Sequence, residues 1–300
     1  MKNKPLVVKP IPVPLGNKHP PPPFSQLPSH EFTMGFIAPK GAGKTTTICN
    51  LLMFYKGYFN TILVFSPTIE SDEKWDWIKQ QELVVENKPL KRWIAAMREK
   101  KQKAGEKSNA VVDPRTAMDM GEFAAIEGIG NFDARIPEEN FFTDYSDDKF
   151  QKIMEEQMNM IKLLKKHNQP KYLANRILVV FDDLVGSGLF SGSRGSYFKG
   201  INTRHRHYSA SFLMVSQGYK EVPKTIRTNW SCLIVFEIGN EKEVEVIYEE
   251  YPMGLRREDW MEVYNYATKD DHSFLYLNIQ APKGLRIMKN FEQYLMVKKD

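Results

Sequence analysis

A glycine-rich segment near the start of the chain carries residue types that bind phosphate. Gly41 and Gly43 have no Cβ, so the backbone there can approach phosphate oxygens closely. The ammonium group of Lys44 can reach the outer phosphates of a nucleoside triphosphate, and the hydroxyl of Thr45 can ligate Mg²⁺. The residues that we predict to bind the nucleotide are Ala38, Pro39, Lys40, Gly41, Ala42, Gly43, Lys44, Thr45 and Thr46.

The flanking segments decide how this motif is interpreted. Residues 32–38 form an apolar run typical of a buried strand, and residues 44–55 have the pattern of a helix, so the glycines lie in a strand-to-helix turn. The usual first glycine of the phosphate-binding motif is replaced by Ala38, which costs little if its φ is negative. A glycine-rich turn with a chance Lys-Thr pair is the alternative.

Two adjacent acids, Asp182 and Asp183, follow a second apolar run at 177–181. Acids at the end of a buried strand are typical of a Walker B motif, in which Asp182 would help Thr45 to hold Mg²⁺ and Asp183 would polarise the attacking water. The pair could instead cap the turn that follows.

Further polar residues are predicted to act on the phosphates. Gln217 follows the apolar run 212–215, where its amide could sense the γ-phosphate or the lytic water. Arg206, Arg204 and Arg227 are candidates for an arginine that reaches the γ-phosphate bound to a neighbouring subunit. Each arginine could equally stabilise a helix end or contact a nucleic-acid backbone. The predicted catalytic residues are therefore Lys44, Asp183, Gln217, Arg206, Arg204 and Arg227.

The elements that must position these residues indicate the α/β class. Continuous apolar runs at 61–66, 177–181, 212–216 and 233–238 are typical of a mainly parallel sheet covered by helices on both faces. The chain has 300 residues, of which 42% are hydrophobic and 26% charged, so wholesale disorder is excluded. Two cysteines cannot supply a disulfide framework or a four-ligand zinc site, and a reducing compartment fits them best. The net charge of +5 permits an anionic partner.

Two segments depart from this pattern. Residues 1–30 hold nine of the 18 prolines, four lysines and no acid, which predicts a flexible, solvated N-terminal tail. Residues 31–300 are assigned to one domain, the P-loop domain, which contains the glycine-rich phosphate-binding segment. Between about 86 and 146 the periodicity weakens and basic residues separate from acidic ones, which indicates a charged insertion that pairs with itself or a neighbour, or is solvated. We expect no signal peptide and no transmembrane segment.

The motifs together resemble the poxvirus-type genome-packaging ATPases of large DNA viruses, which belong to the FtsK-HerA group of ring-forming DNA pumps. The resemblance extends over roughly residues 32–250. The matching segments are APKGAGKT (38–45), NTILVFSPT (60–68), ILVVFDD (177–183), TRHRHYSASFLMVSQ (203–217) and IRTN (226–229). Asp183 departs from it, because many relatives carry glutamate there, and the charged insertion has no match.

The resemblance implies a RecA-like P-loop ATPase that uses ATP and Mg²⁺ to translocate double-stranded viral DNA into a preformed capsid. It implies a homo-oligomeric ring at the virus factory in the host cytoplasm, with a capsid or membrane-associated virion protein as a further partner. The residues alone indicate a Mg-ATP hydrolase. Two rivals stay open: a nucleic-acid helicase of related fold, and an ATP-binding scaffold of virion assembly with negligible hydrolysis. The paired acids at 182 and 183 argue against the scaffold.

Overall fold

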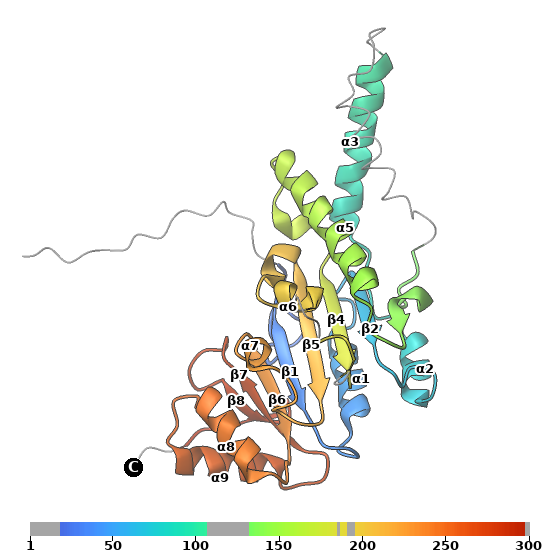
Figure 1. Cartoon of the computed structure of the whole chain (residues 1–300). Coiled ribbons are helices and arrows are strands. Elements are labelled where there is room, and N and C mark those ends of the chain that lie inside the picture. Colours follow the sequence, from blue (N-terminus) through green and yellow to red (C-terminus); the bar gives the residue numbers. More distant parts are fainter. Residues whose placement is uncertain (1–18, 107–131, 185–186, 191–195, 298–300) are drawn as a thin grey trace, which may run out of the picture.

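A nine-stranded sheet forms the centre of the molecule (Figure 1). The computed structural model describes residues 19–106, 132–184, 187–190 and 196–297. The strands of the sheet are β1 (Thr33–Ile37), β2 (Thr61–Phe65), β3 (Phe141–Phe142), β4 (Ile177–Asp182), β5 (Ala210–Ser216), β6 (Cys232–Phe236), β7 (Phe274–Asn278), β8 (Ile287–Lys289) and β9 (Gln293–Tyr294).

Helices and short 3-10 turns connect the strands. The α-helices are α1 (Lys44–Phe54), α2 (Glu73–Lys79), α3 (Lys88–Glu106), α5 (Asp147–Lys166), α6 (Tyr197–Asn202), α7 (Lys224–Arg227), α8 (Glu241–Glu250) and α9 (Arg257–Thr268). The 3-10 turns are η1 (Glu138–Asn140), η2 (Lys171–Leu173) and η3 (His205–Tyr208). Polar side chains fix several helix starts: Asp72, Ser146, Ser196 and Asn240 each accept a hydrogen bond from a backbone N–H of the first turn.

The strand order is β3-β2-β4-β5-β1-β6-β7-β8-β9. The first six strands in this order run parallel, and β7, β8 and β9 continue the sheet antiparallel. The predicted α/β class with a mainly parallel, RecA-like sheet is thus confirmed. The order places β5 between β1, which leads into the glycine-rich turn, and β4, which ends in Asp182. Because the six strands are parallel, their carboxyl ends share one edge, called here the P-loop edge.

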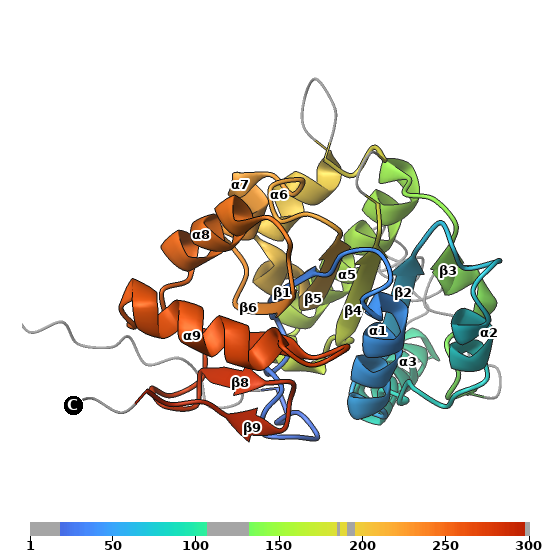
Figure 2. The same cartoon turned by 90° about the horizontal axis from the view of Figure 1, so that it is seen from below.

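Both faces of the sheet are buried, which explains why its strands lack polar alternation. Along β4, for example, Val179 points into a core shared with α5, α6, α8 and α9, whereas Val180 points into a core shared with α1 and α2. Figure 2 shows α1 on one side of the sheet and α5, α6, α7 and α8 on the other.

The N-terminal segment differs from its prediction. Residues 1–18 lie outside the described residues, but residues 19–30 pack against the domain. Leu27 is buried, the hydroxyl of Tyr58 donates to the carbonyl of Pro20 at 2.8 Å, and that of Tyr55 donates to the carbonyl of Pro28 at 2.7 Å. Part of the predicted tail thus packs on the domain, because tyrosines of the domain satisfy carbonyls that water would otherwise satisfy, whereas residues 20, 21 and 23–25 are exposed.

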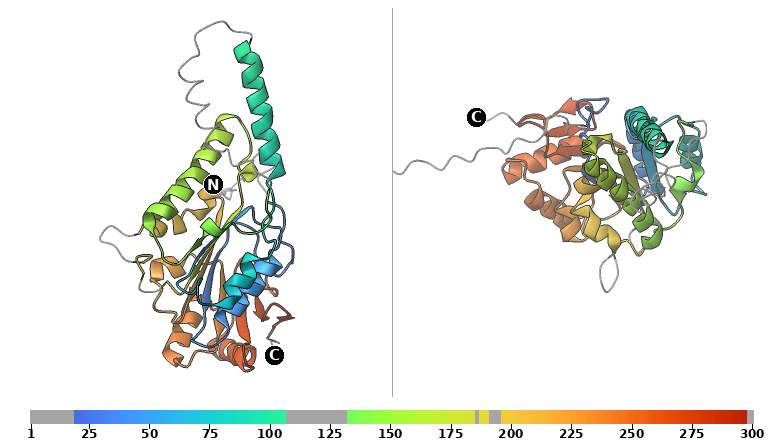
Figure 3. Two further views of the ribbon diagram at one scale, coloured as in Figure 1. Left: turned by 90° about the vertical axis from the view of Figure 1, so that its right-hand side faces the viewer. Right: turned by 90° about the horizontal axis from the view of Figure 1, so that it is seen from above.

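The charged insertion contains regular structure that the sequence pattern did not reveal. Helix α3 projects beyond the sheet, alongside α5 (Figures 1 and 3). At its base, Leu90 and Ile94 are buried in a small cluster with Leu163 and Leu164 of α5. The second half of the insertion supplies β3, which pairs parallel with β2. Residues 107–131 lie outside the described residues, so the pairing of opposite charges within the insertion stays a prediction.

Candidate functional site

The glycine-rich turn has the geometry that a phosphate-binding loop requires. Gly41 and Gly43 adopt φ values of +84° and +92°, in the left-handed region that favours glycine. Gly43 caps α1 without a side-chain hydrogen bond, so N–H groups of the first turn can face a ligand. Ala38 is not among the described residues with positive φ, and its N–H donates to the carbonyl of Ser216 at 3.1 Å. An alanine at this position therefore fits the backbone of the loop.

The carboxylate of Asp182 lies buried at the P-loop edge, at the end of β4. Its Oδ2 accepts a hydrogen bond from the Ser66 hydroxyl at 2.8 Å, whereas its Oδ1 has no hydrogen-bond partner in the described part of the chain. Burial raises the pKa of Asp182 to about 6, and hydrogen bonding to Ser66 and the charge of Lys44 oppose that rise. An unpartnered buried carboxylate oxygen fits a site for a divalent cation such as Mg²⁺.

A third carboxylate, Asp72, belongs to the same site and was not predicted. It caps α2 by accepting from the N–H of Lys74 at 3.1 Å, and it also accepts a hydrogen bond from the Thr45 side chain. Asp72 contributes to raising the pKa of Asp182 by like-charge repulsion. Asp72 thus contacts one predicted metal ligand, Thr45, and lies near enough to the other, Asp182, for its charge to act on it. A cap at the start of a helix is the only signal for it in the sequence.

Three predicted catalytic residues converge beside the glycine-rich turn. The Lys44 ammonium lies 3.4 Å from Asp183 Oδ2, and the Gln217 amide donates to the Oδ2 and Oδ1 atoms of Asp183 at 2.8 Å and 3.1 Å. Asp183 adopts a positive φ of 52°, and its N–H donates to the carbonyl of Val215 at 3.3 Å. This left-handed turn follows the last residue of β4 and directs Asp183 toward the end of β5.

The three predicted arginines do not join this cluster. Arg204 and Arg206 are exposed and precede the first residue of β5, whereas Gln217 follows its last residue. The seven-residue strand separates them from the P-loop edge by roughly 20 Å at the rise of about 3.3 Å per residue. Neither arginine can reach the nucleotide site of its own subunit, so their assignment to a neighbour's γ-phosphate stays a prediction.

The prediction for Arg227 is wrong. Its guanidinium is buried and donates to Glu250 Oε1 at 2.8 Å, to Glu250 Oε2 at 3.2 Å and to the carbonyl of Val222 at 2.8 Å. It also lies over the ring of Tyr219, with its central carbon 4.4 Å from the ring centroid. All of these partners are in its own chain, so Arg227 joins α7 to α8 and is not available to a neighbouring subunit.

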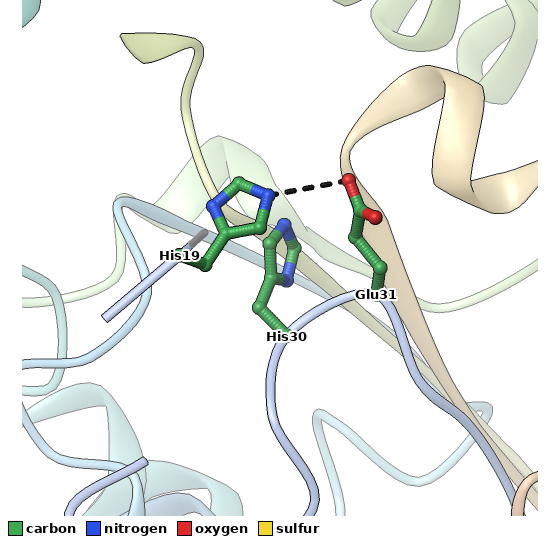
Figure 4. A group of neighbouring side chains, drawn as sticks. All are labelled: His19, His30 and Glu31. Atoms are coloured by element: carbon green, nitrogen blue, oxygen red, sulfur yellow. Dashed lines mark hydrogen bonds and ion pairs between the residues drawn. The ribbon is translucent and has the colours of Figure 1, made fainter. Parts of the chain in front are cut away.

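A separate polar group at the opposite edge of the sheet contains His19, His30 and Glu31 (Figure 4). Potential metal-ligating atoms of these residues lie within 4.8 Å of one another. Both ring nitrogens of His30 already have partners, however: Nδ1 accepts from the Ser211 hydroxyl at 2.8 Å and Nε2 donates to the carbonyl of Ser209 at 2.9 Å. Glu31 is paired with the ammonium of Lys171. His30 and Glu31 are therefore held by hydrogen bonds and an ion pair, whereas Nδ1 of His19 has no hydrogen-bond partner among the described residues.

The fold and the site define the class of protein: a P-loop ATPase, with a phosphate-binding turn after β1 and paired acids at the end of β4. The predicted resemblance is confirmed by the model of the poxvirus A32 protein family, which matches residues 133–276. The matched segment includes Asp182, Asp183 and Gln217 but begins after the glycine-rich turn. No curated protein sequence matches the chain.

Solved structures of similar shape have little sequence identity to the chain. The genome packaging NTPase B204 from Sulfolobus turreted icosahedral virus 2, in complex with AMP, is 11% identical, with 86% of this chain and 96% of that chain covered and a TM-score of 0.47. The same NTPase in complex with ATP-gammaS is also 11% identical, with 86% and 95% covered and a TM-score of 0.45. EssC (ATPases 2 and 3) from Geobacillus thermodenitrificans is 12% identical, with 90% of this chain and 41% of that chain covered and a TM-score of 0.49.

Among the helices that the structure describes, none combines the length and apolar character needed to cross a membrane.

Proposed function

We propose that this chain hydrolyses ATP with Mg²⁺ and uses the energy to translocate double-stranded viral DNA into a preformed capsid. The observation that carries the ATPase part is the convergence of Lys44, Asp183 and Gln217 at the P-loop edge, with the buried carboxylate of Asp182 beside them. The family match to poxvirus A32 proteins and the predicted resemblance to packaging motors support the DNA substrate.

Each residue of the site has a distinct role in this proposal. The backbone around Gly41 and Gly43 and the ammonium of Lys44 bind the β- and γ-phosphates. Thr45 and Asp182 hold Mg²⁺, with Asp72 orienting the Thr45 hydroxyl; the bound cation supplies positive charge that neutralises the phosphates. Asp183 orients the lytic water and accepts its proton, and the amide of Gln217 fixes the direction of the Asp183 carboxylate.

Binding of ATP exchanges the partner of Lys44. In the structure its ammonium contacts Asp183, and the phosphates, which carry more negative charge, compete for it. Asp183, once released from Lys44, keeps its hydrogen bonds to the Gln217 amide and can accept a further hydrogen bond from the lytic water. Substrate binding and activation of the base are thereby linked through one side chain.

The working unit in this proposal is a homo-oligomeric ring. Arg206 or Arg204 of one subunit stabilises charge that develops on the γ-phosphate bound to its neighbour. Both arginines are exposed, as an intersubunit contact requires. We place the ring at the virus factory in the host cytoplasm, with a capsid or membrane-associated virion protein as its docking partner.

The proposal is tested by ATP turnover of the purified full chain, measured with and without double-stranded DNA. A translocating motor should be stimulated several-fold by duplex DNA, and single-stranded DNA of the same length is the matched control. Turnover that responds only to single strands would favour the helicase instead. Stoichiometric ATP binding without turnover would favour the assembly scaffold.

A further inference from the structure

A cavity of about 610 Å³ lies beside the glycine-rich turn, and none of the roles above uses it. It lies between α1 and the antiparallel end of the sheet, and the N-terminal segment at Phe24 also lines it. Gly43, which caps α1, lines it together with Thr47, Asn50 and Phe54 of the helix. These positions are three or four residues apart, so they share one face of the helix, and the cavity follows that face away from the phosphate-binding turn.

The far part of the cavity is aromatic. Phe54 lies edge-to-face with Phe291, with ring centroids 6.0 Å apart, and with Phe24 at 5.7 Å. Phe54 and Phe24 are 37% and 50% exposed, which is costly for phenylalanine in a protein that buries most of its large apolar side chains. An occupant with a flat, apolar surface would remove these rings from water.

Polar groups also line the cavity. The Nδ1 of His272 donates to the carbonyl of Ala42 at 3.2 Å, which holds the imidazole against Gly43. The Oδ1 of Asn290 accepts from the N–H of Phe274 at 3.1 Å, so its Nδ2 is the atom able to donate toward a ligand. Loops from the antiparallel end of the sheet thus place the His272 ring beside the glycine-rich turn and the Asn290 amide on the wall of the cavity.

We propose that this cavity, the nucleoside pocket, binds the ribose and purine base of the nucleotide whose phosphates lie on the glycine-rich turn. The assignment rests on the proposed function, because it requires a nucleoside triphosphate at Lys44. Its basis is continuity: Gly43 and Thr46 belong to the phosphate-binding turn and also line the cavity, so a group attached to the α-phosphate enters it directly. Aromatic walls suit a purine ring, and the amide of Asn290 suits a ring nitrogen that accepts a hydrogen bond.

The proposal assigns a role to the antiparallel strands β7 and β8, which the paired acids and the glycine-rich turn do not need. In this role, the loops around His272 and Asn290 select a nucleotide by its base, and the turn binds it by its phosphates. A ligand that lacks the base should then bind only through the turn.

The test compares two probes on the full chain: ATP-gammaS, which carries the base, and inorganic tripolyphosphate, which does not. Calorimetric titration with Mg²⁺ should give wild-type protein a Kd for ATP-gammaS at least about tenfold lower than for tripolyphosphate. Asn50→Trp places an indole in the cavity and should raise the Kd for ATP-gammaS about tenfold, leaving the Kd for tripolyphosphate unchanged. Asn265→Trp makes the same substitution at an exposed position of α9 outside the cavity, and should change neither value.

Phe54→Ala is the second variant, because it removes an aromatic wall without adding bulk near the phosphates. This variant should raise the Kd for ATP-gammaS several-fold and leave the Kd for tripolyphosphate unchanged. The nucleoside pocket is overturned if the wild-type protein binds the two probes with equal affinity, or if both pocket variants bind ATP-gammaS as tightly as the wild type does. Either result is still consistent with a phosphate site at the glycine-rich turn. Wild-type protein that binds neither probe overturns the proposed function and the pocket with it.

Discussion

The Lys44 ammonium lies 3.4 Å from Asp183 Oδ2, so the side chain that should bind phosphate and the carboxylate that should activate water contact each other directly. The two residues are 139 positions apart and meet because β1 and β4 run parallel with only β5 between them. Substituting either residue removes this contact, and the effects on ATP binding and on turnover can be measured.

Lys44→Ala should abolish ATP turnover, because it removes the cation that binds the β- and γ-phosphates. Its side chain is partly exposed and its ion pair is worth about 1 kcal/mol at most, so the melting temperature should change by only a few degrees. Turnover and thermal melting are the measurements. An aggregated variant whose soluble fraction keeps wild-type nucleotide affinity would contradict the P-loop assignment.

Asp182→Asn and Asp183→Asn should differ in phenotype although the residues are adjacent. Asp182 is buried with an unpartnered oxygen, so its amide variant should weaken Mg-ATP binding. Asp183 contacts Lys44 and Gln217, so Asp183→Asn should bind ATP nearly normally and hydrolyse it more slowly, by roughly a hundredfold. Titration of ATP-gammaS and steady-state turnover separate the two effects. Equal loss of binding in both variants would mean that Asp183 holds the metal as well.

Mixed rings test the arginine that acts across a subunit interface. An inactive Lys44→Ala subunit keeps its arginine, and an inactive Arg206→Ala subunit keeps its phosphate-binding turn, so some interfaces of a mixed ring join two intact halves. Turnover should partly return with Arg206→Ala, or with Arg204→Ala if that residue acts instead. Arg257→Ala is the control, because it alters an exposed arginine that pairs with Glu245 on its own chain. This variant should hydrolyse ATP without being mixed with another subunit. Failure of both mixtures, after sedimentation shows subunit exchange, would remove the two arginines from the active site.

Arg227→Ala should destabilise the domain. The substitution leaves Glu250, whose side chain is only 12% exposed, without its guanidinium partner, and breaking a buried pair in this way costs about 3–5 kcal/mol. Urea unfolding measures the loss. Arg256→Ala removes an exposed arginine paired with Asp259 and should cost less than about 1 kcal/mol. A stability loss as small as that of the control would return Arg227 to the candidates for an intersubunit role.

The His30 network should make the fold sensitive to acid. Burial, with the nearby charges of His19, Arg176 and Lys171, holds the pKa of His30 well below 6.5, although hydrogen bonding to the Ser209 carbonyl opposes this shift. Below pH 6.5, His30 therefore binds a proton in the unfolded chain but not in the folded chain. The contribution of His30 to the free energy of unfolding is fully present well above pH 6.5. It falls as the pH is lowered through 6.5, with a slope of up to about 1.4 kcal/mol per pH unit.

His30→Gln checks this expectation. The variant loses hydrogen bonds at every pH, but urea unfolding at pH 6.5 and 5.5 should show its stability falling less steeply, by about one proton. Between pH 7.5 and 8.5 the two proteins should have the same slope. An unchanged slope between pH 6.5 and 5.5 would show that folded His30 takes up its proton as readily as the unfolded chain does.

The amino-acid sequence by itself determined the features that depend only on residues adjacent in the chain. The glycines at 41 and 43 were identified because only residues without a Cβ adopt their backbone conformation freely, and the structure gives both a positive φ. The buried strands were identified because a strand covered on both faces must be apolar throughout. The paired acids at 182 and 183 were identified from their place at the end of such a strand.

Tertiary structure decided what depends on partners distant in sequence. Arg204 and Arg227 each have another basic residue within three positions in the sequence, but only Arg227 meets a glutamate of α8, which fixes it inside its own chain. Asp72 reached the site because α2 begins beside α1, and the segment before β1 is attached to the domain by hydrogen bonds from Tyr55 and Tyr58 to its carbonyls. The antiparallel strands brought His272 to Gly43 from 229 residues away. Such contacts are set by the order of strands in the sheet, which local composition and periodicity do not specify.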